Sequence, residues 1–261
     1  MDKPGDNVLY ELRGAVALIT LNRPESLNTF NEGFGHDILK ALDRARTTAT
    51  VRAVVLTGAG RGFSAGAELK PPFPAISTMV RRLEDEYAPG ILAITSMPKP
   101  VLAAVNGFAT GIGASYALAC DLLLLEASAF LQSPFARIGL VPDGGLCWQL
   151  ATRLGPRLAF ELACTGERVT AQRCVELGLA NRAVADGKVV EEALAMAEKL
   201  AEAAPLALAG TKRLLRAAPG LGLAATLREE TIEQGLRLGS ADFREGVAAF
   251  LEKRKPQFSG Q

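Results

Sequence analysis

Short apolar runs mark the strands that the sequence predicts. VLYEL and AVALITL, divided at Gly14, have the pattern of a hairpin of two short strands. RAVVLTG over residues 52–58, PVLAAVNG from Pro100 and DLLLLEA from Asp121 are dominated by apolar residues. All three are predicted to be strands, and the continuous apolar run over residues 52–58 is typical of a strand covered on both faces, as in a parallel sheet.

Helical spacing follows these strands. From Asn31, which is placed to cap a helix, apolar residues recur every three or four positions at Phe34, Ile38, Leu42 and Ala45. Strand, glycine-rich loop and helix then occur in that order twice, after residue 54 and after residue 101. This order predicts an α/β core of stacked βα-type turns over residues 1–195.

Residues 196–261 are rich in Ala, Leu, Glu, Lys and Arg and poor in β-branched residues, which predicts a helical C-terminal region. Pro205 is expected to open one of its helices, and Ser240 to cap the last. The last helix carries an apolar face made by Phe243, Val247, Phe250 and Leu251.

Charge does not point to nucleic acid or to a membrane surface. The 261 residues carry a formal net charge of +1, with both signs interspersed. Residues 101–120 are uncharged and as long as a membrane span, but Asn106 and three glycines favour a buried strand, a turn and a helix. The first residues match neither a signal nor a transit peptide, so we expect a cytoplasmic protein.

Several common catalytic machines are absent from the sequence. The single histidine, His36, lies on a predicted helix, and there is no GxSxG or P-loop motif. The cysteines fit no metal template and are expected to be buried or half-buried thiols: Cys120, Cys147, Cys164 and Cys174.

Two glycine-rich loops follow predicted strands, GFSAG at residues 62–66 with Ala67 next, and NGFATGIG at residues 106–113. A turn from strand into helix leaves backbone N–H groups unpaired at the helix start. Two such groups facing one point form an oxyanion hole. The alternative is that the glycines only permit tight turns.

The segment IGLVPDGG places Asp143 between Pro142 and two glycines, with apolar residues around it. Apolar surroundings disfavour the charged carboxylate and raise its pKa, and a raised pKa suits a base that removes a proton from carbon. The alternative is that Asp143 only caps the helix that follows.

AVVLTGAGRGFSAGAELK, PVLAAVNGFATGIGASYALACDLLL, IGLVPDGG and ADFREGVAAFLEKRKPQF, in this order, resemble the crotonase family, also called the enoyl-CoA hydratase/isomerase family. The resemblance implies a spiral of stacked ββα units with a helical C-terminal trimerisation region, assembled as a homo-trimer or hexamer. It implies acyl-CoA thioester substrates, with Ala67 and Ile112 as oxyanion donors. Many relatives have glycine where Ile112 stands, but the donor is backbone.

The family's hydratases use two glutamates, and the matching positions here are Ser115 and Phe135, neither of which can act as an acid or base. Asp143 resembles the single acidic residue of the family's isomerases, and a dehalogenase branch places a nucleophilic aspartate there. Glu68 and Glu84 are the candidates for a second carboxylate.

The resemblance also suggests where coenzyme A binds. Arg23, Leu27, Phe63, Ala65 and Ala67 match positions that contact the nucleotide and pantetheine in relatives. Phe250 and Lys253 on the last helix match positions that complete the pocket, often from a neighbouring subunit. The KRK run at residues 253–255 could instead be a solvated helix end.

The expected function is therefore enoyl-CoA isomerisation of a 3-enoyl-CoA, or of a related ring or epoxide thioester, with one aspartate as acid and base. The alternatives are a hydratase or a hydrolase/dehalogenase on the same scaffold, and an inactive acyl-CoA-binding protein. No metal, flavin or nicotinamide is expected, since coenzyme A is part of the substrate. Acyl specificity is expected to depend on residues 70–87.

Overall fold

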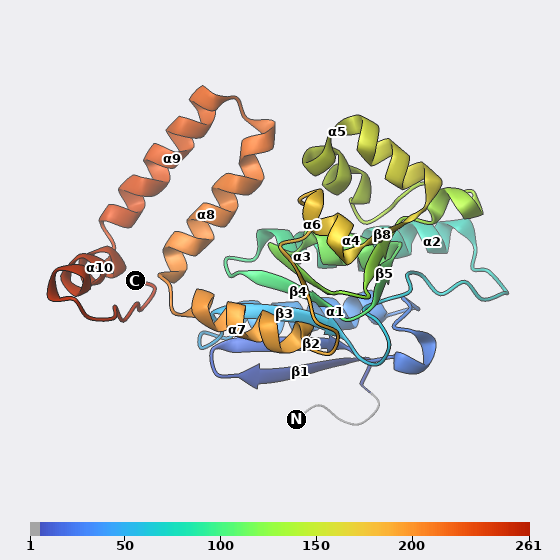
Figure 1. Cartoon of the computed structure of the whole chain (residues 1–261), viewed down its shortest axis with the longest axis horizontal. Helices are drawn as coiled ribbons and strands as arrows, with labels where there is room; N and C mark the ends of the chain where they lie inside the picture. The colour runs from blue at the N-terminus through green and yellow to red at the C-terminus, as the bar shows by residue number, and fades with distance from the viewer. Residues whose placement is uncertain (1–5) are drawn as a thin grey trace.

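The computed structural model describes residues 6–261, and its main sheet has six strands (Figure 1). Strands β1 and β2 pair antiparallel, and every other neighbouring pair in this sheet is parallel. The order is β1 (Val8–Arg13), β2 (Val16–Leu21), β3 (Ala53–Gly58), β4 (Val101–Val105), β6 (Leu122–Glu126) and β9 (Arg182–Val184). The predicted hairpin and the three further predicted strands, β3, β4 and β6, are confirmed.

A second sheet of three short strands packs β5 (Phe108–Thr110) parallel to β7 (Phe130–Gln132), and β7 antiparallel to β8 (Arg168–Thr170). The chain turns from β4 into β5 at Gly107. A Cβ there would lie 2.3 Å from the Arg61 carbonyl oxygen, so glycine is needed for this close approach of two backbones.

Helices make up the rest of the regular structure. In chain order they are η1 (Pro24–Ser26), α1 (Phe34–Thr47), α2 (Ile76–Arg82), the π-helical η2 (Leu83–Tyr87), α3 (Ala88–Ser96), α4 (Ile112–Ala119), η3 (Phe135–Ile138), α5 (Leu146–Thr165), α6 (Ala171–Glu176), α7 (Val189–Ala201), α8 (Pro205–Ala217), η4 (Ala218–Gly220), α9 (Leu223–Leu238) and α10 (Ala241–Glu252). The backbone of α5 is not helical at Gly155, which precedes Pro156.

Apolar clusters cover both faces of the main sheet. In β3, Val54 and Leu56 join the larger cluster together with the four predicted helical residues of α1. The alternate residues Ala53 and Val55 join a second cluster with Ala193 and other residues of α7. Because β3 is covered on both sides, all six of its residues are buried and its sequence is an apolar run.

The C-terminal helices extend away from this core. Helices α8 and α9 form a hairpin that leads to α10 at the opposite end of the molecule from α5 (Figure 1). None of the 16 residues of α9 is buried, and its leucines and isoleucine face outward. Residue 195, the expected division, falls inside α7, which packs on the sheet, so we propose the division after α7.

The predicted caps fare differently. The Ser240 hydroxyl accepts the Phe243 N–H at 3.0 Å at the start of α10, as expected, and Pro205 opens α8. The Asn31 cap is wrong, because α1 begins after Gly33 (φ 82°). There the Glu86 carboxylate, from η2, accepts the Gly33 N–H at 2.9 Å and takes the place of a local cap.

Residues 101–120 form β4, β5 and α4, as the sequence predicted, instead of one long helix. Across residues 6–261 we find no helix with the length and apolar character needed to cross a membrane.

Candidate active site

The two glycine-rich loops are paired with each other by backbone hydrogen bonds. The N–H groups of Phe63 and Ser64 both donate to the Phe108 carbonyl, at 3.0 and 3.1 Å, and Thr110 N–H donates to the Ser64 carbonyl at 3.0 Å. The loops therefore do more than turn the chain: they extend the parallel pairing of β3 and β4 beyond the strand ends and fix the residues that follow.

Ala67 and Ile112 come directly after these paired segments. The Phe30 N–H donates to the Gly66 carbonyl at 2.8 Å, and the Phe30 carbonyl accepts the Glu68 N–H at 3.0 Å. These two backbone bonds lie on either side of Ala67. Within the described residues, no acceptor is bonded to the N–H of Ala67 or Ile112.

The residues before Ala67 and Ile112 lie against each other. A Cβ on Gly111 would be 3.7 Å from the Gly66 Cα. Ile112 is the first residue of α4, where backbone N–H groups lack partners in the helix and the helix dipole favours negative charge. The arrangement can hold an anionic oxygen.

Asp143 lies on a turn that packs on the start of α4. Its carbonyl accepts the buried Ser115 hydroxyl at 2.9 Å. A Cβ on Gly144 (φ +59°) would approach Ile112 Cδ1 to 2.4 Å, so the turn touches the helix that begins at Ile112. Glycine is needed here for both the backbone angle and the space.

The Asp143 carboxylate is partly desolvated, and its pKa is raised. Its Oδ1 atom is buried and has no hydrogen-bond partner among the described residues, and burial raises the pKa of Asp143 from 3.8 to about 6. The alternative role as a helix cap is wrong, because α5 begins after Gly145 with no side-chain cap. A desolvated carboxylate of this kind can act as a base near neutral pH.

The sequence analysis missed Tyr87, on the π-helical segment η2. Its hydroxyl is buried and has no hydrogen-bond partner in residues 6–261. Burial raises the pKa of Tyr87, the Arg82 guanidinium lowers it, and the nearby Asp143 carboxylate raises it again. Tyr87 therefore stays protonated, and it lies close enough to Asp143 for the carboxylate charge to affect its pKa. No sequence motif includes Tyr87. The sequence analysis treated residues 70–87 only as a stretch expected to determine acyl specificity.

The other candidate carboxylates are engaged elsewhere or face solvent. Glu68 pairs with Lys70 at 3.1 Å and lies 4.0 Å from Arg23, and Glu84 is exposed. The buried carboxylate near this region is Glu86, which the sequence analysis did not select and which anchors α1. Ser115 and Phe135, which the resemblance matches to the two glutamates of the family's hydratases, are buried.

The expected coenzyme A contacts divide into two groups. Leu27 and Ala65 are neighbours, since the Ala65 N–H donates to the Leu27 carbonyl at 3.0 Å. Arg23 turns inward: its guanidinium donates to the Thr29 carbonyl. Phe63 is fully buried, so we assign its side chain to the core and not to direct ligand contact.

Phe250 and Lys253 do not join this site within one chain. Phe250 is 83% exposed on α10, and Lys253 ends that helix, at the opposite end of the molecule from α5 (Figure 1). His36 is exposed on α1. Cys147 and Cys164 are exposed, contrary to expectation, whereas Cys120 and Cys174 are buried.

Comparison with known proteins gives a consistent result. The family model described as enoyl-CoA hydratase/isomerase matches residues 11–261. A Rhodobacter capsulatus protein named "Probable enoyl-CoA hydratase" is 42% identical, over 97% of this chain and 98% of the relative. The Escherichia coli "1,2-epoxyphenylacetyl-CoA isomerase" is 36% identical, over 97% and 98%.

Solved structures agree with the sequence comparisons. An enoyl-CoA hydratase structure from Polaromonas superimposes with a TM-score of 0.91 at 36% identity, covering 96% of this chain and 99% of the other. One from Bacillus anthracis has a TM-score of 0.93 at 31% identity, covering 98% and 100%. The chain belongs to the enoyl-CoA hydratase/isomerase family, the crotonase family of acyl-CoA-processing enzymes.

Proposed function

We propose that the protein is an enoyl-CoA isomerase that moves the double bond of a 3-enoyl-CoA to the 2-position. The observation that carries this proposal is the half-buried Asp143 carboxylate beside α4, whose buried Oδ1 atom has no hydrogen-bond partner among the described residues. Ser115 and Phe135, which the family resemblance matches to the two hydratase glutamates, supply no second carboxylate. One group that accepts and returns a proton is enough for isomerisation.

The reaction uses one base and two backbone donors. The N–H groups of Ala67 and Ile112 bind the thioester oxygen. The Asp143 carboxylate takes a proton from C2, and the electrons of that C–H bond enter a dienolate whose negative charge rests on the thioester oxygen. Protonated Asp143 then returns the proton to C4, which gives the conjugated 2-enoyl thioester and restores the carboxylate. Losing one donor typically costs about 3–4 kcal/mol of barrier.

The acyl group and the assembly are also proposals. An epoxide or ring-opened aromatic thioester could replace the straight chain, in line with the similarity to the epoxyphenylacetyl-CoA isomerase. We propose that Leu27 and Ala65 contact coenzyme A in one chain. Phe250 and Lys253 would then reach a site only in another copy, within a homo-trimer or hexamer.

Hydration is the second candidate, because the Rhodobacter capsulatus relative carries a hydratase name. Adding water to a 2-enoyl-CoA needs a group that activates the water and one that protonates C2, and Asp143 would have to serve both. Hydrolysis with Asp143 as nucleophile, and thioester binding without turnover, are the remaining alternatives.

The test is a substrate panel on wild type, Asp143→Asn and the control Asp85→Asn, since Asp85 is exposed on η2. We expect wild type and Asp85→Asn to isomerise 3-enoyl-CoA, and Asp143→Asn to lose a factor of about 10²–10⁴, the usual contribution of a general base. Rapid hydration of 2-enoyl-CoA that survives Asp143→Asn would contradict the assignment. Absence of C2 deuterium exchange in saturated acyl-CoA would favour a binding protein.

A further inference from the structure

The helix that carries the Ile112 donor is held at its other end by two arginines. The Leu118 carbonyl accepts a hydrogen bond from Arg153 Nη2 at 3.0 Å, and the Ala119 carbonyl accepts one from Arg216 Nη2 at 2.6 Å. The last carbonyls of a helix have no partner inside it. Here α5 and α8 supply the partners for α4.

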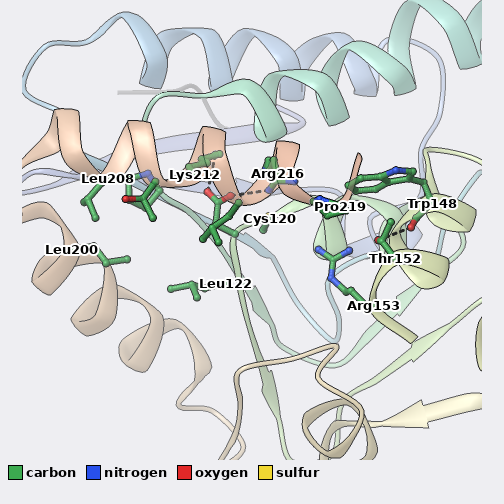
Figure 2. A pocket seen from close by; sticks show the side chains of 14 residues that line it. Cys120, Leu122, Trp148, Thr152, Arg153, Leu200, Leu208, Lys212, Arg216 and Pro219 are labelled. Carbon is green, nitrogen blue, oxygen red and sulfur yellow. Dashed lines mark hydrogen bonds and ion pairs between the residues drawn. The ribbon is translucent and has the colours of Figure 1, made fainter. Parts of the chain in front are cut away.

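Arg216 belongs to a charge cluster on the wall of a cavity of about 400 Å³ (Figure 2). Lys212 and Arg216, one turn apart on α8, both bind the Asp121 carboxylate at 2.7 Å. Figure 2 shows these two side chains beside Cys120, with Arg153 approaching from α5. Asp121 follows the end of α4 by two residues, so the cluster ties that end to α8.

Most donors in this cluster are bound to the protein itself. Lys212 Nζ also donates to the carbonyls of Ile94 and Lys99, at 2.8 and 3.2 Å, and Arg153 Nη1 donates to the side chain of Gln149. The Lys212 side chain is 8% exposed. These contacts suit a structural clamp better than a site that recognises a free anion.

Arg153 and Arg216 bind the C-terminal end of α4, and the expected oxyanion would lie at its N-terminal end. Both therefore interact with the dipole of the same short helix. The eight residues of α4 span about 12 Å. Cations at the C-terminus and an anion at the N-terminus both match the helix dipole. A small displacement of α4 would also move the Ile112 N–H, and misplacement by about 1 Å can cost a hundredfold in rate.

We propose that Arg153 and Arg216 are positioning residues for the oxyanion hole: by binding the last carbonyls of α4, they hold the Ile112 N–H in place opposite the Ala67 N–H. The inference rests on the proposed function only for the thioester substrate and its two donors. It does not depend on whether the reaction is isomerisation or hydration.

The test uses 4-(dimethylamino)cinnamoyl-CoA, an enoyl thioester whose absorption moves to longer wavelength when donors polarise its carbonyl. Arg153→Met is compared with Arg153→Lys and with Arg157→Met. Arg157 is exposed on the same helix, and its side chain makes no hydrogen bond or ion pair within residues 6–261, so its variant controls for charge.

We expect Arg153→Met to bind the probe with nearly unchanged affinity but to lose at least about half of the wavelength shift. Its kcat should fall about tenfold with little change in KM, within the range of effects transmitted through a packed element. Arg153→Lys should recover part of both, and Arg157→Met should match wild type. Arg216→Met should lose more of the shift, measured well below its melting temperature.

The outcomes separate the two proposals. If wild type binds the probe without any wavelength shift, the donor pair itself fails and the proposed function fails with it. If wild type shifts the probe and Arg153→Met does so equally, the positioning role is overturned while the proposed function stands. Equal losses in Arg153→Met and Arg157→Met would also overturn it.

Discussion

Replacing Asp143 by asparagine should make the folded protein more stable at neutral pH. The wild-type carboxylate has been moved partly out of water without gaining a partner for its buried Oδ1 atom among the described residues. Burial raises its pKa from 3.8 to about 6, so the folded state favours the neutral acid. An asparagine of nearly the same shape has no charge to desolvate.

The stability gained by Asp143→Asn should increase as pH rises. Because the folded pKa is the higher one, the folded protein binds more protons than the unfolded chain between about pH 4 and pH 6, and stability falls as pH rises through that window. The shift from 3.8 to about 6 corresponds to a penalty of about 3 kcal/mol at pH 7.5 and about 1 kcal/mol at pH 4.5. Since the carboxyl group is only partly buried, we expect an observed difference of about 1–2 kcal/mol between the two conditions.

Urea unfolding of wild type, Asp143→Asn and the exposed-site control Asp85→Asn, at one protomer concentration, measures this difference. Asp143→Asn should exceed wild type in the free energy of unfolding at the higher pH, and the excess should shrink at the lower pH. Any change in hydrogen bonding by the new amide is common to both conditions and cancels. An excess that is equal at the two pH values, or absent at the higher one, would refute the reasoning.

Three further predictions concern catalysis and packing. The kcat/KM of wild type should rise with pH through a single ionisation near the Asp143 pKa of about 6, because the base must be ionised. Initial rates measured over a series of pH values test this. Gly144→Ala should lower both kcat and the free energy of unfolding, the latter by about 1–3 kcal/mol, because the new Cβ meets an α4 side chain at 2.4 Å. The control Gly145→Ala has the same sign of φ but open space, so an equal loss of kcat there would contradict the packing argument. Lys212→Met should lower the free energy of unfolding in urea by about 1–3 kcal/mol, because it removes one of the two cations bound to the partly buried Asp121 carboxylate and the donor to the Ile94 and Lys99 carbonyls; no loss would show that these contacts are not structural.

Much of the main sheet could be predicted because its signals are local. The apolar run of β3 indicates that both of its faces are covered. The recurrence of apolar residues every three or four positions from Phe34 to Ala45 indicates which side of α1 is buried. Ser240 caps α10 within three residues of itself. The second sheet was not predicted as a unit, because strands of three residues such as β5 are too short to show a period.

The candidate site was only partly predictable, because some of its contacts join distant parts of the chain. The glycine-rich loops and Asp143 stand out as motifs. In contrast, the Glu86 anchor of α1 lies 53 residues from Gly33, and Arg216 reaches Ala119 across 97 residues. Spacing within one element carries no information about such pairs.

The sequence by itself determined strands β1 to β4 and β6, the buried face of α1, the two glycine-rich loops that follow strands, and that one acidic residue stands in an apolar turn. Only the tertiary structure decided that the buried Oδ1 atom of Asp143 has no hydrogen-bond partner within residues 6–261, that Tyr87 lies close enough for the Asp143 charge to raise its pKa, and that two arginines bind the last carbonyls of α4. The physical reason is that periodicity and capping act within a few residues, whereas desolvation and long-range hydrogen bonds exist only after distant elements have packed.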